Sequence, residues 1–409
     1  MINSGDTAFI IIATGLVMLM TPGLAFFYGG MVRRKNVLGV LMQCFAMLCV
    51  ISIQWILFGY SLSFAPGNGF IGGLQWAGLA GVGSQPYPAY AATVPHQAFM
   101  IFQAMFAVIT PALIIGAFAE RMKFSAFLLF SILWATLVYD PVAHWVWGVG
   151  GWLKALGVID FAGGIVVHTT AGIAALVTAL VIGHRKGYAN KPVPPHNLPF
   201  TALGAALLWF GWFGFNAGSA LSANGIAVNA FVVTNTAAAA AGLMWALMEW
   251  WYTGKPTTFG IVTGSIAGLA TVTPASGFVS PLSAIIIGAC ASAVCFISVG
   301  IIKPKLGYDD SLDAFGVHGV GGISGTIMAG IFASSAVNAG GPNGLLFGNP
   351  HQLFIQCIAV LVVSLYTFAV TYGIYTFVDM IIGVRVTEKD EAMGLDLTQH
   401  REGAYTVLE

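Results

Sequence analysis

Eleven apolar runs of about twenty residues divide this 409-residue chain, and their length limits what it can fold into. A helix of about twenty apolar residues crosses the hydrocarbon core of a bilayer, where every backbone polar group must be satisfied within the protein. Only 7% of the residues are charged, against about 25% in a soluble domain. The sequence therefore predicts an all-α integral membrane protein with eleven transmembrane helices. The predicted spans are 7–31, 37–64, 98–119, 125–147, 161–183, 199–219, 227–251, 258–275, 280–302, 312–334 and 352–383.

The basic residues predict the orientation of these helices. If the N-terminus lies outside, the cytoplasmic segments contain every lysine and arginine of the chain except Lys154. The positive-inside rule requires this bias. One span more or fewer would place the basic residues of the later loops on the opposite side of the membrane. We therefore expect a multi-pass protein of the cell membrane (plasma or inner), N-out and C-in. Its cytoplasmic basic residues are Arg33, Arg34, Lys35, Arg121, Lys123, Arg185, Lys186, Lys191, Lys255, Lys303, Lys305, Arg385, Lys389 and Arg401.

The segments between and after the spans divide the chain further. Residues 65–97 and 335–351 contain no Lys or Arg and are rich in Gly, Pro and Asn, so we expect extracytoplasmic loops. Residues 384–409 begin with a charged run that is too polar to cross a membrane. The sequence predicts a membrane domain over 1–383 and a cytoplasmic tail over 384–409.

Charge and cysteine usage exclude several classes of function. The net charge is zero, which argues against a nucleic-acid partner. All five cysteines lie inside apolar runs without metal-ligand spacing, so we interpret them as small packing residues. We expect neither a metal nor a cofactor.

Two histidines lie inside apolar spans where almost nothing else ionises. His168 follows Asp160 by eight residues, and His318 follows Asp310 by the same number. A titratable group is costly inside a membrane, so such residues are functional-site candidates. Their matching places in the fifth and tenth spans predict one shared site at a repeat interface.

This spacing also predicts an inverted repeat. Because five is an odd number, a second set of five spans runs with opposite polarity, which gives repeats over 7–183 and 199–334 followed by a long eleventh helix over 352–383. His168 lies roughly 10 Å inside the outer end of its helix and His318 roughly 9 Å inside the inner end of its own. In a hydrocarbon core about 30 Å thick, the two approach the midplane from opposite sides.

Four roles compete for this pair. The histidines are core residues satisfied by hydrogen bonds between helices, or they bind a metal, for which Asp160 or Asp310 is available only if the chain bends back. Alternatively they perform acid–base chemistry in a membrane enzyme, a role that lacks a third catalytic group and a substrate cavity. Lastly they line a path for a small polar species, to which neutral imidazoles offer hydrogen bonds and a means of passing a proton. The apolar surroundings favour the path, and we expect no enzyme.

Aromatic residues gather at the outer ends of the helices. Phe102 and Phe106 are four residues apart on one helical face, and so are Phe215 and Ser219. Trp147 ends the fourth span. Each aromatic residue alone is typical of an interfacial belt. Together with one hydroxyl group they predict an outer vestibule that attracts a small cation through cation–π interactions.

Eight segments in order along the chain carry a resemblance to a known family. They are Phe26–Asn36, Ala119–Arg121, Ala143–Gly148, Asp160–His168, Trp209–Ala220, Val233–Thr236, Asp313–Gly319 and the tail segment Gly394–His400 with Tyr405. Through them, essentially the whole chain resembles the ammonium transporter family, the Amt branch of the Amt/Mep/Rh superfamily. The resemblance implies transport of ammonium, with methylammonium as an analogue, by a homotrimer in membrane lipid with one pore per subunit.

The resemblance also implies roles for particular residues. His168 and His318 would form a twin-histidine pore. Phe106, Trp147 and Ser219 would form the ammonium recruitment site at the outer end of that pore. Phe106 would also stack with Phe215 to form the gate below the site.

The mechanism implied by the resemblance has two variants. NH4+ releases its proton near the recruitment site and NH3 crosses past the histidines, while the proton either stays outside or crosses by a separate route. Asp160 holds the recruitment site together, and Asp160 and Asp310 are the structural or proton-handling acids. The alternative function is an ammonium sensor of the same fold with little transport. The tail implies regulation by a cytoplasmic PII-type signalling protein.

One residue departs from the family pattern. Asp140 precedes the segment 143–148 at a position where the family usually has a neutral residue. It either adds negative potential near the outer mouth or pairs with a neighbouring helix, and we favour the pairing.

Overall fold

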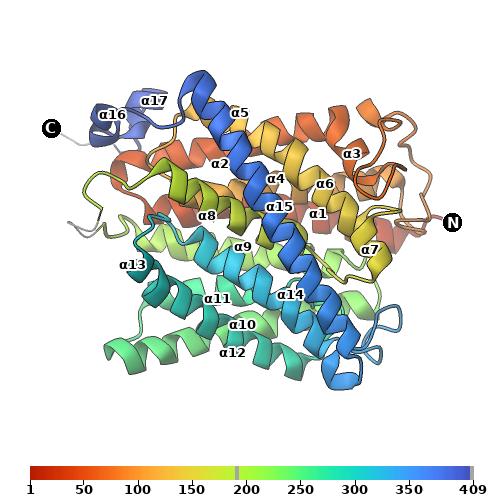
Figure 1. Ribbon diagram of the computed structural model, residues 1–409. Coiled ribbons are helices and arrows are strands. Elements are labelled where there is room, and N and C mark those ends of the chain that lie inside the picture. Colours follow the sequence, from red (N-terminus) through yellow and green to blue (C-terminus); the bar gives the residue numbers. More distant parts are fainter. Residues whose placement is uncertain (189–192, 406–409) are drawn as a thin grey trace.

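The computed structural model describes residues 1–188 and 193–405, which form a bundle of long helices (Figure 1). Lys191 and the last four residues of the predicted tail lie outside these ranges. Within them the structure contains no β-strand. The protein is therefore all-helical, as the sequence predicts.

The helices vary widely in length, and short π-helical stretches interrupt several of them. The α-helices are α1 (Ser4–Met31), α2 (Val37–Gln54), α3 (Tyr60–Phe64), α4 (His96–Phe118), α5 (Phe124–Trp134), α6 (Asp140–Trp147), α7 (Trp152–Leu156), α8 (Thr170–Ile182), α9 (Leu198–Gly218), α10 (Gly225–Thr253), α11 (Thr258–Val272), α12 (Pro281–Ile297), α13 (Lys303–Leu306), α14 (Val320–Phe332), α15 (Pro350–Ile382), α16 (Glu388–Met393) and α17 (Leu395–His400). The π-helical stretches are η2 (Trp55–Gly59), η4 (Ala135–Tyr139), η5 (Gly164–Thr169), η6 (Ser298–Ile302) and η7 (Phe315–Gly319). The 3-10 turns are η1 (Arg34–Asn36), η3 (Ala77–Leu79) and η8 (Leu345–Phe347).

Ten helical segments in the described part of the chain are long and apolar enough to cross a membrane. They correspond to the predicted spans except 258–275, where α11 has only 15 residues. Such a helix rises about 22 Å, which is less than the thickness of the hydrocarbon core. The start of α1 and the tail helix α17 lie at opposite ends of the bundle (Figure 1), as an odd number of crossings requires. The count of eleven stays a prediction, and it depends on α11.

Polar caps mark where the helices of the second half begin. The side chain of Asn224 accepts hydrogen bonds from the backbone N–H groups of Ile226 and Ala227 at the start of α10. Thr257 caps α11 and Ser280 caps α12 in the same way. These side chains satisfy N–H groups that the first turn of a helix leaves without partners.

The fifth and tenth spans share an unusual local structure. Each begins with a π-helical stretch, η5 or η7, in which the last residue but one is a histidine, His168 or His318. The fourth and ninth spans also pair, because η4 interrupts one and η6 ends the other. This matching pattern agrees with the predicted inverted repeat.

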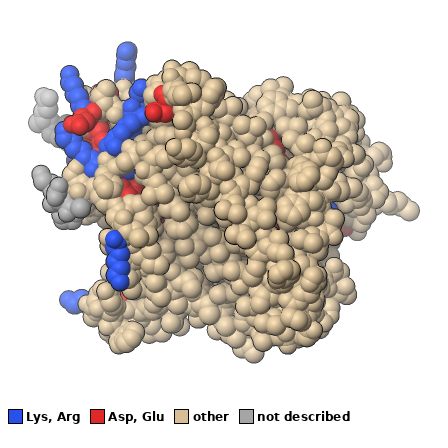
Figure 2. Space-filling view, viewed as in Figure 1, with Lys and Arg blue, Asp and Glu red and all other residues tan. Residues whose placement is uncertain are grey.

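Charged side chains gather at one end of the molecule, where α16 and α17 lie (Figures 1 and 2). Arg33 and Arg185 lie 2.7 and 3.6 Å from the carboxylate of Glu120. Arg185 and Arg121 lie 2.8 and 3.4 Å from the carboxylate of Asp309. These ion pairs, which we call the inner ion cluster, join the end of α1, the α4–α5 turn and the segments beside α8 and η7.

Acid is expected to destabilise the protein through the inner ion cluster. Burial raises the pKa of Glu120 and Asp309, but the neighbouring guanidinium groups outweigh burial and hold both pKa values below their ordinary range. Because the folded-state pKa is the lower one, this stabilisation is fully present above about pH 4 and is lost as the pH falls through the folded pKa. Thermal unfolding in detergent between about pH 7 and about pH 3 measures the loss. Glu120→Gln should flatten the acid limb, and an equally steep limb in the variant would contradict this account.

The predicted tail folds back onto the inner end of the bundle. The Asp396 carboxylate accepts a hydrogen bond from the backbone N–H of Gly39 at 2.8 Å. The side-chain oxygen of Asn36 accepts one from the backbone N–H of Leu395, also at 2.8 Å. These two bonds hold α17 against the start of α2.

Candidate functional site

The structure brings His168 and His318 together in the centre of the bundle. Their ring centroids lie 5.3 Å apart with an angle of 11° between the planes. The two residues are only 1% and 3% exposed. The prediction that the pair meets at one site therefore agrees with the geometry.

Glycines allow the two histidine segments to approach this closely. Gly172 and Gly322 each follow a histidine by four residues. A Cβ atom at Gly172 would overlap the backbone of Gly319, and one at Gly322 would lie 2.8 Å from the Cβ of His168. Because backbone faces backbone at this crossing, no side chain separates the two rings.

The nitrogens of the two rings are buried beside a small apolar cavity. Neither ring nitrogen of His168, nor Nδ1 of His318, has a hydrogen-bond partner among the described residues. The cavity beside them leaves about 10 Å³ for the centre of a water-sized molecule, enough for one. Besides the two histidines it is lined by Met20, Leu24, Phe27, Ile109, Leu113, Val167, Leu208, Trp212, Phe215 and Ile266. Since buried polar atoms normally have partners, this site suits a small hydrogen-bonding molecule.

Trp212 orients the ring of the first histidine, a role that was not predicted from the sequence. Its ring stacks on His168 with the centroids 5.4 Å apart and the planes at 19°. The indole N–H of Trp212 donates a hydrogen bond to the hydroxyl of Thr273 at 2.9 Å. The run Trp209–Ala220 carried the only signal, because it places a tryptophan one turn before Phe215.

Asp160 caps the first histidine segment. Its carboxylate accepts hydrogen bonds from four successive backbone N–H groups, with donor–acceptor distances between 2.6 and 3.1 Å. The donors are Gly163, Gly164, Ile165 and Val166. A carboxylate that accepts four such bonds has little capacity left for a metal ion. The geometry therefore favours a structural role for this acid.

Asp310 caps the second histidine segment in the same manner but with fewer bonds. Its carboxylate accepts the backbone N–H groups of Ala314 at 3.1 Å and of Phe315 at 2.8 Å. The repeated spacing of eight residues therefore separates a capping aspartate from the histidine in the helical segment that it caps.

All three residues of the predicted recruitment site line an outer cavity of about 280 Å³. They are Phe106, Trp147 and Ser219. The rings of Phe106 and Trp147 lie 6.0 Å apart and nearly perpendicular, at 89°. The Trp147 indole N–H donates a hydrogen bond to the backbone oxygen of Asp160 at 2.8 Å, which orients the ring. The same cavity contains Gln103, whose buried side-chain oxygen has no partner in the described part of the chain. The sequence predicts no role for Gln103, although it lies between Phe102 and Phe106 on α4.

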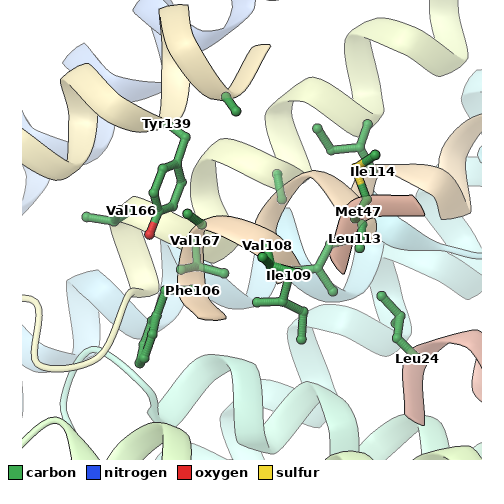
Figure 3. Close-up of a cluster of buried hydrophobic side chains, with 14 of the residues drawn as sticks. Leu24, Met47, Phe106, Val108, Ile109, Leu113, Ile114, Tyr139, Val166 and Val167 are labelled. Atoms are coloured by element: carbon green, nitrogen blue, oxygen red, sulfur yellow. The ribbon is translucent and has the colours of Figure 1, made fainter. Parts of the chain in front are cut away.

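Two stacked rings separate the outer cavity from the histidines. Phe106 and Phe215 lie 4.2 Å apart at 29°, and the Phe215 ring is 6.1 Å from that of His168. Figure 3 shows Phe106 at one end of a row of apolar side chains that includes Val167 and Ile109. The rings therefore lie where the predicted gate should be.

Asp140 lies away from the outer cavity. It is fully buried, and its carboxylate accepts hydrogen bonds from the side chains of Gln54 at 2.8 Å and Ser63 at 3.3 Å. Gln54 immediately precedes η2, and Asp140 immediately follows η4. Of the two roles considered, the geometry favours pairing with a neighbouring helix.

Comparisons with known proteins agree over nearly the full length of the chain. The family model described as Ammonium Transporter Family matches residues 8–405. An ammonium transporter of Bacillus subtilis is 56% identical over 402 residues, covering 98% of each chain. Ammonium transporter Amt1 of Archaeoglobus fulgidus is 50% identical, covering 99% of this chain and 100% of its own. The crystal structure of Mep2 from Saccharomyces cerevisiae superposes with a TM-score of 0.89 at 37% identity, covering 95% of this chain and 91% of its own. A structure described as a sensor Amt protein gives a TM-score of 0.89 at 29% identity, covering 97% and 98%.

Proposed function

This chain belongs to the ammonium transporter family, and we propose that it recruits NH4+ in the outer cavity and passes NH3 between the two histidines. It is a multi-pass membrane protein that transports ammonium. The family is one of transporters rather than enzymes.

The observation that carries this mechanism is the set of unpartnered imidazole nitrogens in an apolar path. NH3 both donates and accepts hydrogen bonds, so neutral imidazoles replace part of the hydration that it loses. A bare cation in the same path would be far more costly. K+ has no proton to release, so a path of this kind rejects it.

The outer cavity is suited to a cation rather than an anion. The faces of Phe106 and Trp147 offer cation–π attraction worth about 0.5 to 2 kcal/mol. The hydroxyl of Ser219 donates its hydrogen to the backbone oxygen of Phe215 at 2.9 Å. Its lone pairs therefore remain available to accept a hydrogen bond from NH4+.

Replacing both pore histidines, in His168→Leu with His318→Leu, is expected to reduce ammonium flux or to admit K+. The variant removes one hydrogen bond to NH3 from each imidazole, each worth about 0.5 to 1.5 kcal/mol, so we expect at least about a fivefold change in flux or selectivity. Currents in proteoliposomes under separate ammonium and K+ gradients measure both quantities. His351→Leu, on the exposed outer turn of α15, is the matched control. Unchanged flux and selectivity in the double variant would refute the role of the pair.

The same currents test the fate of the proton. A current that follows the ammonium gradient means that the proton crosses with its substrate, whereas flux without current means that NH3 alone crosses. The sensor alternative predicts binding without flux. Uptake of labelled methylammonium, in cells that lack other transporters, distinguishes a transporter from a sensor. The higher identity to proteins named as transporters favours transport.

We further expect a homotrimer in the membrane, with one pore in each copy, and a PII-type signalling protein on its inner face. Two features support binding of the PII-type protein. The tail over 384–405 is held against the inner end of the bundle, and a nearby cavity of about 280 Å³ is lined in part by Arg185, Tyr188 and Lys303. Native mass spectrometry of the purified protein, with and without a PII protein, tests both assemblies.

A further inference from the structure

Lys154 lies at the wall of the outer cavity. It belongs to α7, between the end of α6 and the start of η5, and it lines the same cavity as Phe106 and Trp147. Its Nζ donates a hydrogen bond to the backbone oxygen of Trp147 at 2.9 Å. The same nitrogen lies 5.8 Å from the centroid of the Tyr90 ring.

The charge of Lys154 is not neutralised by an ion pair. No carboxylate lies within 4.0 Å of its Nζ in the described ranges. Asp160 also lines the cavity, but its carboxylate accepts four backbone N–H groups and makes no ion pair with Lys154. The predicted topology makes Lys154 the only lysine or arginine on the outer side. A full positive charge therefore faces the cavity that recruits a cation.

We propose that Lys154 sets the affinity of the outer site, by opposing its occupation by any cation and so holding the site in a low-affinity range. This inference rests on the proposed recruitment of NH4+ in the outer cavity. Repulsion acts alike on NH4+, methylammonium and K+ because each carries one positive charge. The site therefore empties readily and is not blocked by K+ when that ion is abundant outside.

The size of the cavity gives the expected effect. A sphere of 280 Å³ is about 8 Å across, so a cation inside it lies within about that distance of Nζ. Two like charges at about 8 Å in an aqueous vestibule change a binding constant by about two- to sixfold. Lys154 is exposed to solvent, so salt should screen the repulsion.

The test compares the ammonium concentration for half-maximal current in proteoliposomes that contain wild type, Lys154→Gln, Lys154→Met and Lys154→Arg. At about 10 mM ionic strength, set with N-methylglucamine gluconate, Gln and Met should lower this concentration by about two- to sixfold, and Arg should leave it unchanged. At about 0.5 M the difference should vanish. External K+ should inhibit the Gln variant more strongly than wild type. Lys389→Gln makes the same change of charge on the exposed cytoplasmic tail and should behave as wild type.

Two results would overturn the proposal. One is an unchanged half-maximal concentration in Lys154→Gln at low salt. The other is a shift in Lys154→Met alone, because Gln keeps a donor for the Trp147 carbonyl and the residue would then act only as a cap of α6. Trp147→Leu tests the recruitment site independently of the role proposed for Lys154. If that site is correct, this variant raises the half-maximal concentration even when the Lys154 variants do nothing.

Discussion

Asp160→Ala is expected to abolish ammonium transport and to lower the free energy of unfolding by at least about 3 kcal/mol. The substitution leaves four successive buried N–H groups at the start of η5 without an acceptor. An unsatisfied buried donor costs about 1 to 3 kcal/mol, and the four costs are not fully additive because the segment can relax. Relaxation would shift His168, which lies in η5, and Trp147, which donates to the Asp160 backbone.

The matched comparison is Asp310→Ala at the second cap. That carboxylate accepts two backbone N–H groups rather than four, so its loss should cost about half as much. Asp160→Asn keeps one side-chain acceptor and should lie between Asp160→Ala and wild type. Thermal unfolding in detergent and flux in proteoliposomes give both readouts. Wild-type flux in a folded Asp160→Ala protein would show that the cap does not position the pore.

Gly172→Ala is expected to reduce stability and transport nearly as much as Asp160→Ala does, although it adds only one methyl group. The new Cβ would overlap backbone atoms of Gly319, which cannot rotate away as a side chain would. The two histidine segments must separate, at a cost of about 3 kcal/mol, at the upper end of the range for overpacking. Separation moves the two imidazoles apart, so we expect reduced flux or weaker discrimination against K+.

Gly373→Ala is the control for this prediction. Gly373 lies in α15, and a Cβ there would meet nothing within 4 Å. That variant should be neutral or slightly stabilising, since alanine favours a helix over glycine by about 1 kcal/mol. Flux and unfolding temperature, measured for both variants, test whether the close approach at Gly172 is required. A Gly172→Ala protein as stable and as selective as Gly373→Ala would mean that the crossing tolerates a wider separation.

The pairing of the two histidines could be predicted from the sequence because ionisable residues are rare in these spans. His168 and His318 stood out against an apolar background, and the repeated aspartate gave their relation. The crossing at Gly172 could not be predicted in this way. The chain has 52 glycines, and nothing local distinguishes one that touches another backbone from one that faces lipid.

The span over 258–275 illustrates a second limit. Hydropathy continues past the end of α11, but Pro274 has no backbone N–H with which to extend the helix. The turn supports the first histidine segment instead, because Phe161 donates its backbone N–H to the Pro274 oxygen at 3.1 Å. A Cβ at Gly164 would also overlap the Pro274 ring. Apolar composition reports burial, whereas the end of a helix depends on such tertiary contacts.

The glycine crossing also bears on how fast a molecule can pass. A transporter that rocks one part against another would have to pull apart the backbones of Gly172 and Gly319, which touch with no side chain between them. Between the outer cavity and the histidines, the groups that need to move are the rings of Phe106 and Phe215. Side chains reorient much faster than domains, which move in microseconds to milliseconds. Each substrate molecule would then cross a rigid route in which only the two phenylalanine rings rotate. The transport rate would therefore depend on the ammonium concentration at the outer cavity.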